Sequence, residues 1–170
     1  MRDGRSRFQE RDEVTLAEVT VPPLPLTGRC QCGALSYEIR GLPLTFYFCH
    51  CTECQKQSAS AFGESLQTNV ADVVFSGERA HYSRLTDSGR TLVGAFCPNC
   101  GTRMSHHSPG EPAMSIKGGT LDDRSWLKPA GHIWTRSRQP WVVFGSGELV
   151  FETRAEKGVL SARWREMTGA

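Results

Sequence analysis

Three thiols fall within six residues in the segment Cys49-His50-Cys51-Thr52-Glu53-Cys54. On a β-strand the side chains of residues i and i+2 point to the same face, so Cys49 and Cys51 can direct their sulfur atoms to one point, and Cys54 can return from the following turn. Zinc binds thiolates at about 2.3 Å in tetrahedral geometry, and three protein ligands with one open position are typical of a catalytic site. The segment therefore predicts a zinc site that does chemistry.

The other four cysteines form two pairs, Cys30 with Cys32 and Cys97 with Cys100. The second pair has the form of a zinc knuckle, in which Gly101 lets the backbone amides approach the sulfur atoms. Four thiolates complete a tetrahedral zinc site and leave no open position, so this set predicts a structural zinc. We expect two zinc ions per chain, one structural and one catalytic.

Other uses of the seven cysteines stay open. Their odd number and the absence of a secretory signal make a disulfide framework less favoured than metal chemistry. A redox pair at Cys97 and Cys100 requires a βαβ context, which this strand-rich sequence does not show. An iron–sulfur cluster on the three-cysteine set lacks the usual fourth thiolate.

The fourth ligand of the three-cysteine site is the main question. His50 points away from Cys49 and Cys51 if the segment is a strand, which disfavours it as a ligand. The other candidate histidines are of a kind that is more often hydrogen-bonded in the core or exposed to solvent than bound to a metal. The sequence does not bring them to the metal. They are His106, His107 and His132.

The elements that must position these cysteines are mostly strands. Leu35, Tyr37 and Ile39 alternate with polar residues as in a half-buried strand. Aromatic residues over Thr45–Phe48 favour a strand that leads into Cys49, and Thr52–Ala61 favours one or two helical turns. Further strands are expected near Phe62–Gln67, Val73–Ser76, Ala80–Arg84, Thr91–Phe96, Arg103–His107 and Met114–Lys117, and turn signals between them favour antiparallel sheets.

The C-terminal third is less regular. The sequence predicts a short helical turn at Arg124–Leu127 and extended segments at His132–Thr135 and Trp141–Phe144. A capping-box pattern of Thr153 with Glu156 precedes apolar residues at helical spacing and predicts a terminal helix. Those apolar residues are Leu160, Trp164 and Met167.

Length and charge limit the functional classes. A chain of 170 residues is expected to hold a flexible arm over 1–26, one zinc-binding domain over 27–150 and a helical extension over 151–170. Twenty basic and eighteen acidic residues give a net charge of +2, which provides no broad field for nucleic acid. Without an apolar run of membrane-spanning length or a signal peptide, we expect a cytoplasmic protein with no membrane partner.

Five short motifs resemble the glutathione-dependent formaldehyde-activating family, which includes centromere protein V. The resemblance covers about residues 27 to 145. The motifs are Gly28-x-Cys30-x-Cys32-Gly33, Cys49-His50-Cys51-x-x-Cys54, Phe96-Cys97-x-x-Cys100-Gly101, Gly119-Thr120-Leu121-Asp122 and His132-Ile133-Trp134.

The resemblance implies a mainly β fold, with antiparallel sheets in a β-tent arrangement, zinc knuckles and short helices. It also implies a structural zinc on Cys30, Cys32, Cys97 and Cys100, and a catalytic zinc on Cys49, Cys51 and Cys54. The activity of the family joins glutathione to formaldehyde and makes its members carbon–sulfur lyases in the reverse direction.

The leading hypothesis is a zinc-dependent enzyme of the carbon–sulfur lyase type. A glutathione-like thiol would be held as thiolate and would add to formaldehyde or a related small carbonyl, because the thiolate is the nucleophile. Glu53 and Lys56 are candidates for handling protons, or are solvated helix positions. The alternatives are a non-catalytic zinc-binding module for a protein or another partner, and a metal store or sensor.

Overall fold

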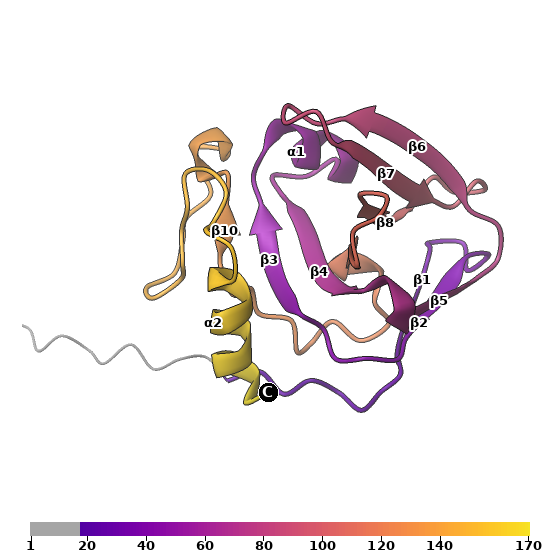
Figure 1. Ribbon diagram of the computed structural model, residues 1–170, viewed down its shortest axis with the longest axis horizontal. Helices are drawn as coiled ribbons and strands as arrows, with labels where there is room; N and C mark the ends of the chain where they lie inside the picture. Colours follow the sequence, from indigo (N-terminus) through magenta and orange to yellow (C-terminus); the bar gives the residue numbers. More distant parts are fainter. Residues whose placement is uncertain (1–17) are drawn as a thin grey trace, which may run out of the picture.

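The computed structural model describes residues 18–170, which form two β-sheets with helices at their edges (Figure 1). Of the arm predicted over 1–26, residues 1–17 lie outside the described part. The seven-stranded sheet has the order β10-β3-β4-β9-β8-β7-β6, and the smaller sheet has the order β1-β2-β5. The prediction of a mainly β fold is confirmed.

The strands agree closely with the sequence patterns. The large sheet consists of β3 (Thr45–Cys49), β4 (Gly63–Asn69), β6 (Ala80–Leu85), β7 (Thr91–Phe96), β8 (Arg103–His107), β9 (Ala113–Ile116) and β10 (His132–Ile133). The small sheet consists of β1 (Leu26–Arg29), β2 (Ser36–Ile39) and β5 (Val73–Ser76). The helices are α1 (Thr52–Ser58), α2 (Val159–Thr168) and the 3₁₀ turns η1 (Val70–Asp72), η2 (Gly118–Thr120) and η3 (Thr135–Ser137).

The two faces of the large sheet differ in character. Along β4, Leu66 and Thr68 are buried on the core side, whereas Ser65 and Gln67 line a cavity on the other side. The alternation follows from the two-residue period of a strand. The core side also holds Phe46, Met104 and Ile116. One face of the sheet therefore stabilises the fold and leaves the opposite face free to carry polar side chains.

The sheet is not wholly antiparallel, which corrects one expectation. Strand β10 pairs with β3 in parallel, with Phe48 opposite His132 and Cys49 opposite Ile133. A parallel partner must come back through a crossover, and here residues 117–131 form the connection from β9 to the far edge of the sheet. This pair places His132 beside the strand that carries Cys49.

The sequence also predicted an extended segment at Trp141–Phe144 and a helical turn at Arg124–Leu127 in the C-terminal third. Trp141–Phe144 forms no strand, because it lies in a loop between Pro140 and Gly145 without a partner to pair with. The short helical turn predicted at Arg124–Leu127 is present as a single hydrogen-bonded turn, in which the amide of Leu127 donates to the carbonyl of Arg124 at 3.1 Å.

The predicted capping box does not start the terminal helix. Helix α2 begins at Val159, after Gly158, whose φ of 87° interrupts any earlier helical turn. The carbonyl of Thr153 instead accepts a hydrogen bond from the amide of Trp134 at 2.9 Å. Residues 149–153 therefore extend along the segment that follows β10.

Helix α2 packs beside β3 and covers the edge of the core (Figure 1). Trp164 is buried against Phe46 and Trp126, and its indole N–H donates to the carbonyl of Pro43 at 3.1 Å. The amide of Val19 donates to the carbonyl of Met167 at 2.8 Å, so the chain ahead of β1 lies on this helix. Among the helices of residues 18–170, none has the length and apolar composition needed to cross a lipid bilayer.

Candidate metal centres and cavity

The first cysteine cluster joins two hairpins that are far apart in the sequence. The sulfur atoms of Cys30, Cys32, Cys97 and Cys100 all lie within 4.8 Å of one another. The sulfur of Cys32 is 3.5 Å from that of Cys30 and 3.7 Å from that of Cys97. A metal ion held here would link the β1–β2 hairpin to the β7–β8 hairpin.

The loops that carry this cluster are shaped by local backbone features. Gly33 and Gly101 each follow a cysteine of the cluster by one residue and adopt φ values of 79° and 72°, which glycine tolerates without strain. The amide of Leu35 donates to the Cys30 sulfur at 3.2 Å. The hydroxyl of Thr102 lies 3.1 Å from the Cys100 sulfur and is the first of the contacts that lower the pKa of Cys100 to about 5. These donors favour the thiolate form that metal binding requires.

The second cluster forms where β3 runs into α1. Cys49 is the last residue of β3, Cys51 is the N-cap of α1, and Cys54 lies in the first turn of that helix. Their three sulfur atoms also lie within 4.8 Å of one another. The Cys51 sulfur accepts from the Cys54 amide at 3.4 Å. Gly63, opposite Cys49 on β4, leaves the space that Cys54 uses, because a Cβ there would lie 3.1 Å from the Cys54 Cβ.

The donor set of this second cluster suits a soft divalent cation. Contacts with Cys49 and then Cys54 lower the pKa of Cys51, and contacts with Cys51 and then Cys54 raise the pKa of Cys49. Among the three thiols, Cys51 is the one whose thiolate form the neighbouring sulfur atoms favour most. Thiolate sulfur is a preferred ligand of zinc. Each of the two cysteine clusters could hold a metal ion, and their ligand atoms are consistent with zinc.

His50 lies between two of these cysteines but faces the interior. It is fully buried, and its Nε2 shares a hydrogen bond of 3.0 Å with Nδ1 of His132. The carboxylate of Glu148 is 3.3 Å from Nε2 of His132. Burial, followed by the charges of His132 and Arg138, lowers the pKa of His50 to about 4, so the ring is neutral at pH 7. His50 therefore packs β3 against β10 rather than joining the cluster.

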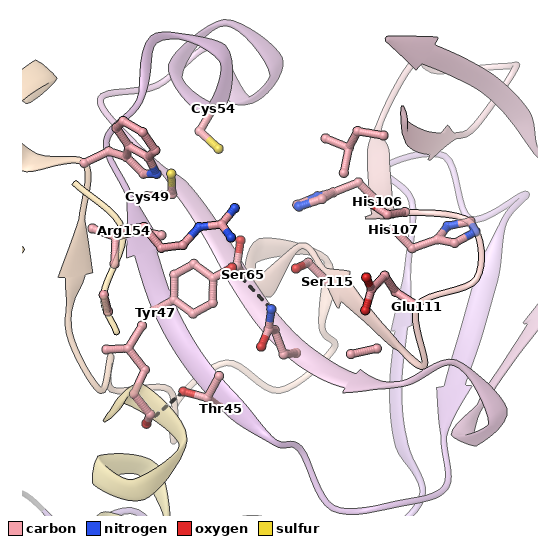
Figure 2. A pocket seen from close by; sticks show the side chains of 18 of the residues that line it. Thr45, Tyr47, Cys49, Cys54, Ser65, His106, His107, Glu111, Ser115 and Arg154 are labelled. Atoms are coloured by element: carbon pink, nitrogen blue, oxygen red, sulfur yellow. Dashed lines mark hydrogen bonds between the residues drawn. The ribbon is translucent and has the colours of Figure 1, made fainter. Parts of the chain in front are cut away.

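A cavity of about 420 Å³ opens on the polar face of the sheet, and Cys49 and Cys54 lie in its lining (Figure 2). In Figure 2 the sulfur atoms of both cysteines, the guanidinium group of Arg154 and the ring of His106 point into one space. The polar floor comes from β3, β4 and β9. It consists of Thr45, Tyr47, Ser65, Gln67 and Ser115.

Two neutral groups with donor hydrogens face this space. Burial and then the charge of Cys49 raise the pKa of Tyr47 to about 12, so its phenol stays protonated. Burial holds the pKa of His106 well below its ordinary value, and the charges of Lys117, Arg103 and Arg84 lower it further. At neutral pH the cavity therefore offers a phenol and a neutral imidazole near the thiols.

The C-terminal segment supplies a wall of the cavity that the sequence analysis missed. Residues 154–158 and 160–161 line it, with the cations Arg154 and Lys157 among them, and Arg84 and Arg90 lie on the β6–β7 side. The sequence offered no periodic signal for this contact. Glu53 and Lys56 pair with each other at 3.1 Å on the exposed side of α1 and do not belong to the cavity lining. His107 lines the cavity as well.

A mainly β domain with one four-thiol cluster at the junction of two hairpins and one three-thiol cluster at the edge of a cavity is of the class of proteins that could hold two metal ions. A model of the family described as glutathione-dependent formaldehyde-activating enzyme matches residues 25–137, and the chain belongs to this family.

Comparisons with individual proteins add no information on the substrate of this chain. No protein of curated function matches the chain significantly. A crystal structure of a Rhodobacter sphaeroides protein, determined as a structural genomics target, has 17% sequence identity and a TM-score of 0.48. The match covers 74% of this chain and 99% of that one.

Proposed function

We propose that this protein is a zinc-dependent enzyme of the carbon–sulfur lyase type, which adds a substrate thiol to formaldehyde or a related small carbonyl. One observation carries the proposal: the three-thiol cluster opens into a cavity of about 420 Å³, with Cys49 and Cys54 in its wall. The four-thiol cluster is instead built into a loop junction. Membership of the family supports the general reaction class.

The three cysteines set the chemistry of this site. Zinc bound by three thiolates would carry a formal charge of −1 and would hold a substrate thiol in its nucleophilic thiolate form. Cys49 fixes one ligand on the sheet, while Cys51 and Cys54 fix two on the start of α1. The hydrogen bonds from Gln55 Nε2 to the carbonyls of His50 and Ser137, both 2.7 Å, hold that helix start in place.

The remaining cavity residues orient the carbonyl. In the addition, a sulfur–carbon bond forms, the carbonyl π bond breaks, and the proton that the thiol has lost ends on the new alcohol oxygen. The phenol of Tyr47 and the neutral ring of His106 can donate to that oxygen as negative charge develops on it, which is where oriented donors are most effective. Both side chains point into the space in front of the cysteines (Figure 2).

The charge of the cavity wall indicates the kind of thiol. Arg84, Arg90, Arg154 and Lys157 line it, against the acidic residues Glu111 and Glu156. An excess of cations favours a substrate that carries carboxylates, as glutathione does. A volume of about 420 Å³ falls within the range of about 300–1,000 Å³ that is usual for pockets of small organic ligands.

The test is an exchange measurement by NMR. Zinc-loaded protein is mixed with formaldehyde and a panel of thiols that includes glutathione, cysteamine and 2-mercaptoethanol, and the interconversion of aldehyde and hemithioacetal is followed. We expect acceleration that is greatest for carboxylate-bearing thiols and is lost in Cys54→Ser. Lys56→Ala, on the exposed face of the same helix, is the matched control and should retain the rate. Exchange no faster than the uncatalysed reaction for every thiol would favour a non-catalytic zinc module.

A further inference from the structure

Lys117 is a buried cation without a partner. It follows β9 directly, only 8% of its surface is exposed, and its Nζ finds no hydrogen-bond partner within residues 18–170. Lysine is almost never this buried unless its charge is compensated, because removing an ammonium group from water is very unfavourable. The position therefore needs an explanation.

The strand register places this side chain on the cavity face of the sheet. Gln67 pairs with Ser115 across β4 and β9, so Lys117, two residues further along, falls opposite Ser65 on the same face. Ser65 in turn pairs with Tyr47, and two residues away Gly63 pairs with Cys49. Lys117 thus starts from the part of the sheet that lies under the three-cysteine cluster.

The backbone of Lys117 is held at that place by hydrogen bonds on both sides. Its amide donates to the carbonyl of Met104 at 2.9 Å. Its carbonyl accepts from the amide of Thr120 at 2.9 Å and from the Thr120 hydroxyl at 2.7 Å. The side chain is therefore anchored at its base and has little freedom to turn toward solvent.

The charges that act on the ammonium come mainly from the cluster. Burial lowers the pKa of Lys117 to about 8, the thiols of Cys54, Cys49 and Cys51 act in the opposite direction, and Arg103 adds to the lowering. His106 is neutral beside it, and Glu64, on the far side of β4, has a raised pKa because of its burial. The cysteines are thus the negative groups that oppose this charge.

We propose that Lys117 is a positioning residue whose ammonium group compensates the negative charge of the metal–thiolate centre at Cys49, Cys51 and Cys54. The inference rests on the proposed second zinc site. The centre would carry a formal charge of −1 with its three thiolates and −2 once a substrate thiolate is added. Because attraction to one cation grows with that charge, Lys117 favours the thiol-bound form more than the thiol-free form.

The proposed role predicts that replacing Lys117 has opposite effects with and without metal, which a purely structural role does not predict. Without metal, the cysteines carry at most one thiolate in place of three, so the buried charge of Lys117 is only partly compensated, and replacing it with an apolar residue of similar shape should stabilise the metal-depleted protein. With metal, the same replacement removes the counter-charge and should weaken the site. One substitution is therefore expected to act in opposite directions in the two states.

The experiment uses the full chain with Lys117→Met, Lys117→Arg and the exposed control Lys128→Met. Cobalt(II) at the second site is titrated with a chelator, and 2-mercaptoethanol is then titrated against the thiolate-to-cobalt absorption band. The melting temperature of protein from which the second metal has been removed is also measured. For Lys117→Met we expect roughly tenfold weaker cobalt binding, a larger loss of 2-mercaptoethanol affinity and a higher metal-depleted melting temperature. Lys117→Arg and Lys128→Met should stay near the wild type.

Unchanged cobalt and 2-mercaptoethanol affinities in Lys117→Met, or a lower metal-depleted melting temperature, would overturn the proposal. If Lys117→Met does not fold, Lys117→Gln removes the same charge and is tested in the same way. These binding measurements do not depend on turnover. A wild type that binds cobalt but does not accelerate thiol addition would count against the proposed reaction and leave the role of Lys117 to be decided by the titration.

Discussion

At the scale of single residues, three consecutive side chains separate two kinds of chemistry. The sulfur atoms of Cys49 and Cys51 belong to the three-thiol cluster, while His50 between them turns inward to His132. The thiols can bind a metal. The hydrogen-bonded imidazoles of His50 and His132 hold the end of β3 against β10. The backbone is still extended at Cys51, with φ of −65° and ψ of 151°, so successive side chains alternate in direction beyond the end of β3.

The four-thiol cluster should be required for folding, and Cys97→Ser tests this at one residue. Cys97 is fully buried, and structural zinc contributes about 10–16 kcal/mol where whole domains are stable by about 5–15 kcal/mol. We expect Cys97→Ser to unfold or aggregate, as judged by circular dichroism and thermal melting. Cys51→Ser, at the second cluster, should remain folded. A native melting temperature for Cys97→Ser after chelation would show that this zinc is not structural.

At the scale of elements, many strands were predictable from the residue pattern within the strand itself, wherever the partner strand lies in the sequence. The patterns at Val73–Ser76, Thr91–Phe96 and Arg103–His107 match β5, β7 and β8 without a shift. The two-residue strand β10 was not predictable as a parallel partner of β3. Its position depends on contacts with residues more than eighty positions earlier, and local patterns do not carry such information.

The terminal helix illustrates a competition between two local signals. Thr153 with Glu156 has the form of a helix start, yet the backbone of Thr153 pairs with Trp134 instead. Gly158 then sets the true start through its left-handed conformation. Tertiary hydrogen bonding and glycine geometry together overrode the capping pattern.

Helix α2 should stabilise the whole core through Trp164. This side chain is 2% exposed and packs against Phe46 and Trp126, so Trp164→Ala should lower the free energy of unfolding by about 3–5 kcal/mol. Urea unfolding measures the change. Trp141→Ala is the matched control, because Trp141 is 70% exposed and its loss should change stability by no more than about 0.5 kcal/mol. Equal effects of the two substitutions would show that α2 does not seal the core.

At the scale of the whole molecule, the two cysteine clusters were predictable from the sequence and the cavity was not. Spacing alone indicated which cysteines belong together, because a metal ion needs a fixed number of donors. The wall around Cys49 and Cys54 is assembled from β3, β4, β6, β7, β8, β9 and the C-terminal segment. Residues such as Tyr47, His106 and Arg154 meet there only after the chain has folded, so no motif could have grouped them.

The two clusters should release metal at different rates. We expect two zinc ions per chain in purified protein, and the ion at the three-thiol cluster should leave first, since it has one fewer protein ligand and faces a cavity. Elemental analysis at successive chelator concentrations measures this, and a melting curve at each step shows when the fold is lost. A single zinc per chain, or iron with visible absorbance, would contradict the assignment.

The cavity wall formed by residues 154–158 and 160–161 also has a consequence for the order in which the site matures during translation. All seven cysteines have been synthesised by residue 100, about 60 residues before this wall is complete. At about 5–20 residues per second this interval lasts roughly 3–12 s. We therefore expect the second thiol cluster to be open to a zinc donor in the nascent chain before the segment that encloses it has been synthesised.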